Sequence, residues 1–144
     1  MEKKTLKNLK YGNFDVEVYQ VQNYPVLVYA MKGFMAKNHI GQYINDLLEL
    51  AEKHRPKAMI ADSSQIKVLS AEVQEIIVRD FWPKVAEMGL LYNPVVAPKS
   101  SLSSGSIERM VHNTQTISLS NGSQMEIGTF DSPESAFEWV VEKL

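Results

Sequence analysis

The sequence contains no cysteine. Disulfide scaffolds, thiolate zinc sites, iron–sulfur clusters and cysteine nucleophiles are therefore excluded. A charge excess of either sign is also missing, because 15 lysine and arginine residues stand against 17 aspartate and glutamate residues, for a net charge of −2. A chain with this balance has no general attraction for nucleic acid, so we expect none as a partner.

Long hydrophobic runs are absent as well. The apolar run from Val26 to Ala30 is far shorter than the roughly 20 residues that a helix needs to span a bilayer. The first ten residues carry four lysines, but the apolar segment of a secretory signal does not follow them. We therefore expect a cytoplasmic protein without a transmembrane segment.

The composition is that of an ordinary globular protein. Of the 144 residues, 44% are hydrophobic and 22% are charged, which is enough apolar material for a core without metal or disulfide support. The sequence has no internal repeat and no long linker. We expect one domain over residues 1–144, with residues 1–13 as a flexible N-terminal segment.

The first half of the chain has the patterns of two strands, a helix and a third strand. Residues 14–21 alternate between apolar and polar, and residues 26–31 are almost continuously apolar. Residues 39–55 have apolar side chains at helical spacing, and Pro56 ends that helix. A short apolar strand at 57–61 is expected to end at Asp62.

The second half continues this alternation. Ser70 is a good N-cap for a second helix, which Gly89 ends and which Pro83 is expected to kink or restart. The remaining elements are a strand at 90–97, a serine-rich loop at 98–106, a third helix with Ile107, Met110 and Val111, a strand at 125–130, and a last helix capped by Ser132. The order β-β-α-β-α-β-α-β-α predicts an α/β domain with a mostly parallel five-stranded sheet, flanking helices, and a first strand antiparallel to its neighbour.

Five segments carry a resemblance to a known fold: Tyr24-Pro25-Val26-Leu27-Val28, Ile60-Ala61-Asp62, Leu69-Ser70-Ala71-Glu72-Val73-Gln74, Gly89, and the final stretch from Phe130 to Trp139. They resemble the STAS domain of anti-sigma-factor antagonists and, more closely, bacterial STAS-like or CRAL-TRIO-like proteins of unassigned function. The resemblance implies a single STAS-like domain. It further implies a non-catalytic regulatory module that binds a protein partner, with no cofactor.

Ser70 is the residue through which the resemblance implies regulation. In anti-sigma-factor antagonists a partner kinase phosphorylates a serine at the start of the second helix, in an Asp-Ser-Ser-Gly-like motif. Ser70 matches that acceptor, whereas Leu69 and Ala71-Glu72 replace its neighbours. N-capping alone also explains a serine here, so both readings stay open. We expect the partner contact at Ser70 and at the adjoining Asp62-Ser63-Ser64.

A small apolar ligand or lipid is the alternative to a protein partner. Ligands of open α/β sheets bind at the carboxyl ends of the strands. Four apolar residues are candidates to line a pocket there: Phe34, Met35, Leu102 and Met110. CRAL-TRIO domains enclose a lipid, although this chain lacks obvious extra helices for a gate.

The serine-rich loop is a candidate anion contact. Lys99, Ser103, Ser104 and Arg109 could present a cation, hydroxyls and backbone N–H groups to a phosphate or carboxylate. The loop lacks the spacing of a P-loop or of a dinucleotide site, so a solvated loop with a serine cap explains it more simply.

Catalytic and metal-binding patterns are missing from the sequence. There is no Gly-x-Ser-x-Gly motif, and the histidines at 39, 54 and 112 are too far apart to form a ligand pair on one helix. We therefore expect no catalytic residues and no metal. An exposed first strand would leave a sheet edge for pairing between copies, so the sequence is compatible with an oligomer.

Overall fold

Six strands form one sheet in the computed structural model, which describes residues 4–11, 14–35, 37–98 and 125–144. The strands are β1 (Lys4–Tyr11), β2 (Phe14–Val21), β3 (Tyr24–Met35), β4 (Ala58–Leu69), β5 (Tyr92–Val96) and β6 (Glu126–Phe130), and they lie side by side in chain order. β1, β2 and β3 pair antiparallel, and β3, β4, β5 and β6 pair parallel. The predicted α/β class, with its mostly parallel strands and antiparallel start, is confirmed.

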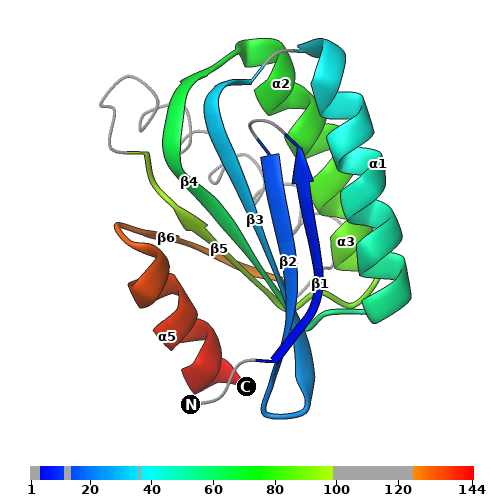
Figure 1. The fold of residues 1–144 in the computed structure, drawn as a ribbon, viewed down its shortest axis with the longest axis vertical. Coiled ribbons are helices and arrows are strands. Elements are labelled where there is room, and N and C mark those ends of the chain that lie inside the picture. The colour runs from blue at the N-terminus through cyan, green and yellow to red at the C-terminus, as the bar shows by residue number, and fades with distance from the viewer. Residues whose placement is uncertain (1–3, 12–13, 36, 99–124) are drawn as a thin grey trace.

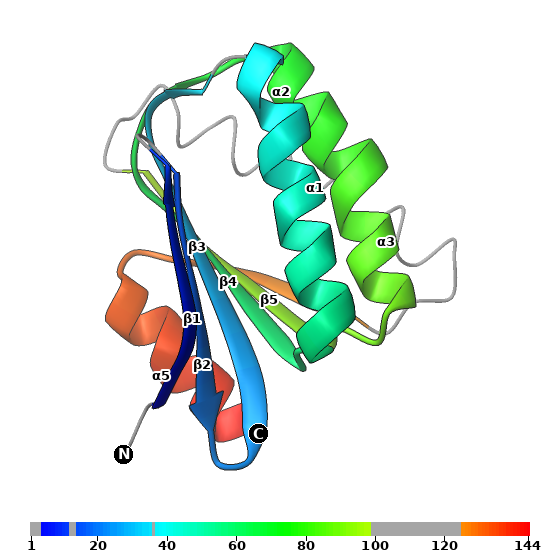
Figure 2. The same cartoon turned by 45° about the vertical axis from the view of Figure 1, so that its right-hand side comes forward.

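The helices lie on both faces of this sheet. They are α1 (Lys37–His54), α2 (Ala71–Ile76), the π-helical turn η1 (Ile77–Phe81), α3 (Trp82–Glu87) and α5 (Pro133–Lys143). Figures 1 and 2 show α1, α2 and α3 on one face and α5 on the other. The third helix expected near Ile107 lies outside the described residues.

β1 is a correction to the prediction from sequence. We expected residues 1–13 to be a flexible segment, but residues 4–11 pair with β2 from Lys4 opposite Gln20 to Tyr11 opposite Phe14. A register shift between Thr5 and Lys7 interrupts the pairing. The segment has weak strand propensity and several lysines, as is common in edge strands, and pairing with β2 overrides that propensity.

The larger core lies between the sheet and the helices α1, α2, η1 and α3. Phe14, Val16 and Val18 of β2 all point into it, as their period-two spacing predicts. From α1, Tyr43 stacks on Phe14 with ring centroids 4.4 Å apart. The same face of the sheet contributes Tyr29, which meets Phe81 edge-on at 5.8 Å.

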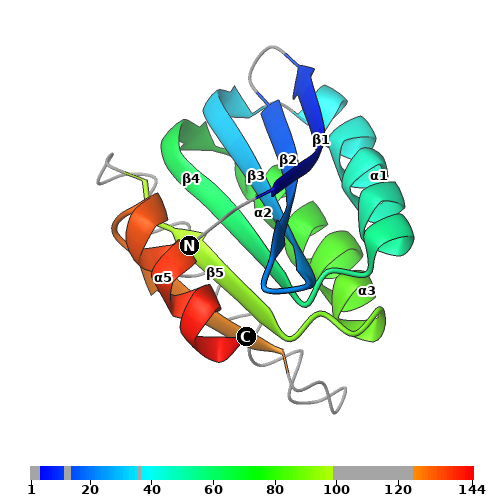
Figure 3. The same ribbon diagram turned by 60° about the horizontal axis from the view of Figure 1, so that its bottom comes forward.

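The smaller core lies under α5, which packs on β4, β5 and β6 (Figure 3). Val96, Ala136 and Val140 are fully buried there. Ser132 caps α5 by accepting the N–H of Ser135 at 3.1 Å, and Pro133 follows it in the first turn. The predicted cap and start of this helix are confirmed.

Pro83 divides the long helical segment between Ser70 and Gly89, as predicted. The chain passes through η1 and restarts as an α-helix at Trp82, with Pro83 in its first turn. Proline has no N–H to donate to the preceding turn, and the wider π turn accommodates its ring. Gly89 follows the helix with φ +97°, a conformation that glycine adopts without strain.

β3 and β4 extend beyond the other parallel strands. Ala30, Asp62, Val96 and Phe130 form one row across the sheet, and Val96 and Phe130 are the last residues of β5 and β6. Past this row, β3 and β4 continue together to Met35 and Leu69. We call this part the β3–β4 overhang.

Candidate functional site

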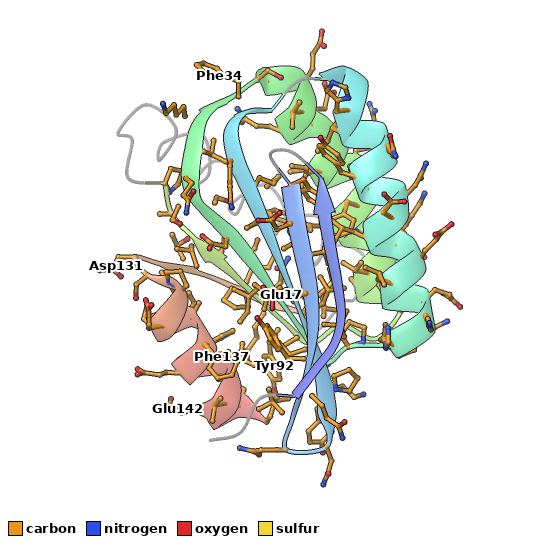
Figure 4. All side chains as sticks on the ribbon, in the orientation of Figure 1. Glu17, Phe34, Tyr92, Asp131, Phe137 and Glu142 are labelled. Atoms are coloured by element: carbon orange, nitrogen blue, oxygen red, sulfur yellow. The ribbon has the colours of Figure 1, made fainter. Side chains whose placement is uncertain are left out.

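The end of the β3–β4 overhang brings Phe34 close to Ser70. Phe34 is the strand partner of Val68, and β4 ends one residue later, directly before Ser70. The side chain of Phe34 is 67% exposed, and Figure 4 shows it at the extremity of the sheet. Lys67, on the neighbouring strand, is also exposed. Phe34, Lys67 and Ser70 define what we call the strand-end surface.

The backbone positions Phe34 through a local irregularity. The β3–β4 register shifts between Ala30 and Lys32 and again between Gly33 and Phe34. Gly33 has φ +67°, which favours glycine because an L side chain would be strained there. The strand therefore turns at Gly33.

Ser70 is the N-cap of α2, as predicted. Its hydroxyl oxygen accepts the N–H of Val73 at 3.2 Å, and its carbonyl accepts the N–H of Gln74 at 3.0 Å. Ser70 is nevertheless exposed, so its hydroxyl lies within reach of a partner protein. A phosphoacceptor role for Ser70 stays a prediction.

Asp62, Ser63 and Ser64 do not adjoin Ser70, and they do not end a strand. They lie inside β4. Ala30 pairs with Asp62 and Lys32 pairs with Gln65, so a step of two residues on β3 faces a step of three on β4. The extra residue on β4 makes a β-bulge. Ser70 lies eight positions after Asp62, about 26 Å if the strand were straight. Ser70 and the Asp62-Ser63-Ser64 segment, which we expected to form one contact surface, therefore lie at two separate places on β4 and its end.

The bulge has its own hydrogen bonds. The Asp62 carboxylate accepts the backbone N–H of Ser64 at 3.1 Å and its hydroxyl at 2.6 Å. Ser63 is 1% exposed, and its hydroxyl has no partner among the described residues. Asp62 thus makes an Asx-type hydrogen bond that stabilises the bulge.

Polar side chains of β2 and β3 lie on the face of the sheet that carries α5. The Lys32 ammonium binds the Asp15 carboxylate at 2.8 Å. This hydrogen bond and the charge of Asp15 raise the pKa of Lys32, burial opposes them, and the charge of Asp62 adds to the increase. The hydroxyl of Tyr19 donates to Glu17, and burial followed by this carboxylate raises the pKa of Tyr19 to about 12.

A groove of about 410 Å³ lies between these strands and the first half of α5. It is lined by Tyr19 of β2, Val28 of β3, Ile60 of β4, and Pro133, Glu134, Phe137 and Glu138 of α5. The sequence did not reveal it, because its walls come from four elements that only the fold brings together. The one signal was Tyr19, an aromatic on the otherwise acidic side of residues 14–21.

Other predicted site residues lie outside the described part of the chain. Lys99, Leu102, Ser103, Ser104, Arg109 and Met110 all belong to that undescribed part, and only the backbone of Met35 is described. The predicted anion contact and apolar pocket therefore stay predictions.

The described residues contain no group of three or more histidine, aspartate or glutamate side chains placed to hold a metal ion. His39 and His54 lie at opposite ends of α1. Among the described helices, none combines the length and the apolar character needed to cross a membrane.

The sequence matches no protein-family model and no curated protein. Among solved structures, the fold is similar to that of an uncharacterized protein of the DUF3478 family with a SpoIIAA-like fold, from Shewanella loihica PV-4. The two structures superpose with a TM-score of 0.57 over 92% of this chain and 98% of that chain, at 12% sequence identity. At this identity the likeness establishes the fold alone. The chain therefore has a SpoIIAA-like fold, which confirms the STAS-like architecture predicted from its sequence.

Proposed function

We propose that the chain is a non-catalytic cytoplasmic regulatory domain that binds a protein partner through the strand-end surface. The observation that carries this proposal is the exposure of Phe34. Nearly all large hydrophobic side chains of the described residues are buried or half-buried, whereas Phe34 is 67% exposed at the end of the sheet. Aromatic side chains are enriched in protein interfaces and among the residues that anchor them.

Ser70 is the second element of the proposal, as the acceptor of a regulatory phosphate. A phosphate would add close to two negative charges beside Phe34, at the start of a helix that already carries Glu72 in its first turn. Ser70 is exposed and outside the core, so this charge would change the surface and leave the packing intact. Binding through Phe34 would then be switched by charge at Ser70.

Native mass spectrometry of the protein isolated from its own cells tests the partner. We expect a retained partner mass with the wild-type chain and its loss with Phe34→Ala. Tyr24→Ala is the matched control, since Tyr24 is an exposed aromatic (39%) at the opposite end of the same strand. A denaturing spectrum of the same sample then reports any phosphate that survives unfolding.

Two substitutions separate the charge of Ser70 from its capping role. Aspartate caps a helix about as well as serine, so Ser70→Asp should keep the stability of the fold while adding a negative charge. We expect it to weaken partner binding. Ser70→Ala should lose the cap, at a cost of about 1 kcal/mol, yet keep the partner. Unchanged partner affinity in both Phe34→Ala and Ser70→Asp would rule out the strand-end surface.

The alternative of a small apolar ligand near Phe34 has less support. A residue that lines an enclosed apolar pocket is itself largely buried, and Phe34 is not.

A further inference from the structure

The groove beside α5 has an apolar floor and lies away from the strand-end surface. Val28 and Ile60 form its floor, and the rings of Tyr19 and Phe137 stand on either side. Figure 4 shows Phe137 on α5. Tyr19 and Phe137 both pack against the smaller core, so they lie on the same side of the sheet. A volume of about 410 Å³ lies within the range of roughly 300–1,000 Å³ that is typical of sites for small molecules.

The rim of the groove is acidic. Glu134 and Glu138 are four positions apart on α5, so both project from one side of the helix over the groove. Both are exposed, and neither forms an ion pair with any described residue. A third carboxylate, that of Glu17, lies beside the groove and accepts the hydroxyl of Tyr19.

None of the residues that the structure describes in the lining of the groove is positively charged. Two lysines with described side chains form ion pairs with other carboxylates, Lys32 with Asp15 at 2.8 Å and Lys143 with Glu126 at 3.4 Å. Two carboxylates therefore face the groove without a counter-charge from the described residues. Such a rim disfavours anionic ligands and attracts cations.

We propose that this groove binds a small organic cation with an apolar body. Glu134 and Glu138 hold the ammonium group, and Val28, Ile60 and the ring of Phe137 contact the apolar part. The face of the Phe137 ring adds a cation–π contribution when the charge lies above it. The hydroxyl of Tyr19 stays protonated and bound to Glu17, so it keeps that carboxylate in place at the edge of the site.

A titration with three matched probes tests the charge preference. Phenethylamine is cationic at neutral pH, phenethyl alcohol is neutral, and hydrocinnamate is anionic, while all three share one apolar body. We expect phenethylamine to give saturable shifts of the backbone amide signals of Val28, Ile60 and Phe137 in NMR spectra. The alcohol should bind about fivefold more weakly, and the anion more weakly still. Equal affinity for the alcohol, or no saturable shift with phenethylamine, would overturn the proposal.

Variants on α5 locate the cation. The double substitution Glu134→Gln/Glu138→Gln keeps the shape of both side chains and should weaken phenethylamine binding about tenfold. Glu142→Gln is the control for each of the single substitutions Glu134→Gln and Glu138→Gln, because it also removes one negative charge and Glu142 is an exposed carboxylate on the same helix that does not line the groove (Figure 4). An equal loss in the control would mean that the net charge of the protein matters and the groove does not.

A groove-filling variant tests the floor independently of charge. Val28 is half-buried on the floor, and Val28→Phe should occupy the space of the ligand and abolish the shifts. Phe34→Ala, by contrast, should leave the titration unchanged, because Phe34 lies outside the groove. The two proposals therefore succeed or fail separately.

Discussion

The indole N–H of Trp82 donates a hydrogen bond to the hydroxyl of Tyr29 inside the apolar core. The side-chain amide of Asn93 satisfies both of its neighbours when its oxygen faces this N–H, at 3.1 Å, and its nitrogen faces the carbonyl of Met59, at 2.9 Å. These four residues come from α3, β3, β5 and β4, and all are buried. The network therefore joins the restarted helix to three neighbouring strands, and it satisfies polar groups that would be costly to bury alone.

Trp82→Phe should destabilise the protein by about 2–4 kcal/mol. It removes the donor shared by Tyr29 and Asn93 and leaves space beside both. The free energy of unfolding in urea measures the effect. Trp139→Phe is the control, because Trp139 is only half-buried against Tyr92 and Phe130, and it should cost less than half as much. Equal losses would show that the hydrogen bonds of Trp82 contribute little.

Alkaline pH should destabilise the fold through Tyr29. Burial raises the pKa of Tyr29 from 10.0 to about 12, and the Trp82 hydrogen bond offsets only part of that effect. The contribution of Tyr29 to the free energy of unfolding is therefore fully present below pH 10, where its phenol is neutral in both the folded and the unfolded chain. It is lost as pH rises to about 12, because in that interval the phenol ionises only in the unfolded chain. The loss should reach about 3 kcal/mol. Unfolding curves between pH 9 and 12 would record it.

Tyr29→Phe is the matched variant for this pH dependence. It lacks the ionising group, so its stability should decline less steeply over the same interval. The difference between the two curves isolates Tyr29 from the other tyrosines and the lysines. Parallel curves would mean that the Tyr29 phenol ionises as readily in the folded chain as in the unfolded one.

The serine cap of α5 should be worth about 1 kcal/mol. Ser132→Ala removes the oxygen that accepts the N–H of Ser135, whereas Ser132→Asp supplies another acceptor. We expect the alanine variant to lose stability in urea and the aspartate variant to stay within about 0.5 kcal/mol of wild type. If both variants lose the same amount, the second hydrogen bond, between the hydroxyls of Ser132 and Ser135 at 3.0 Å, is the important one.

Two glycines should respond to alanine with opposite signs. At Gly33, with φ +67°, an added Cβ meets no atom within 4 Å, so the cost of Gly33→Ala is that of the backbone conformation, about 1 kcal/mol or more. Gly41 lies exposed inside α1, where alanine is the better helix former, and Gly41→Ala should stabilise by up to about 1 kcal/mol. Thermal unfolding of both variants would decide the signs.

Local patterns in the sequence predicted the local structure well. The serine caps at Ser70 and Ser132, the helix restart at Pro83 and the period-two burial of residues 14–18 each depend on near neighbours in the chain, and each is confirmed. Features that depend on distant partners were missed. β1 forms because residues 4–11 pair with the edge of β2. The bulge at Asp62 forms because β4 pairs with β3.

In the candidate sites, too, the sequence identified single residues but not which distant residues lie together. Phe34 and Ser70 were both named from the sequence, but their proximity follows from the β3–β4 register and not from their spacing. From the sequence, the groove residues have the pattern of ordinary packing residues, each within its own strand or helix: Tyr19, Val28, Ile60 and Phe137. Their arrangement around one groove depends on where α5 crosses the sheet, which no local pattern specifies.

The β3–β4 overhang has an evolutionary consequence. Past Met31, which still pairs with Phe14 of β2, the described sheet narrows to the two strands β3 and β4, so a substitution at the tip disturbs few neighbours. Selection can then exchange Phe34 for another side chain at little cost to folding, while the wide part of the sheet stays constrained by its two cores. Related chains should accordingly differ more in sequence at this tip than in the wide part of the sheet.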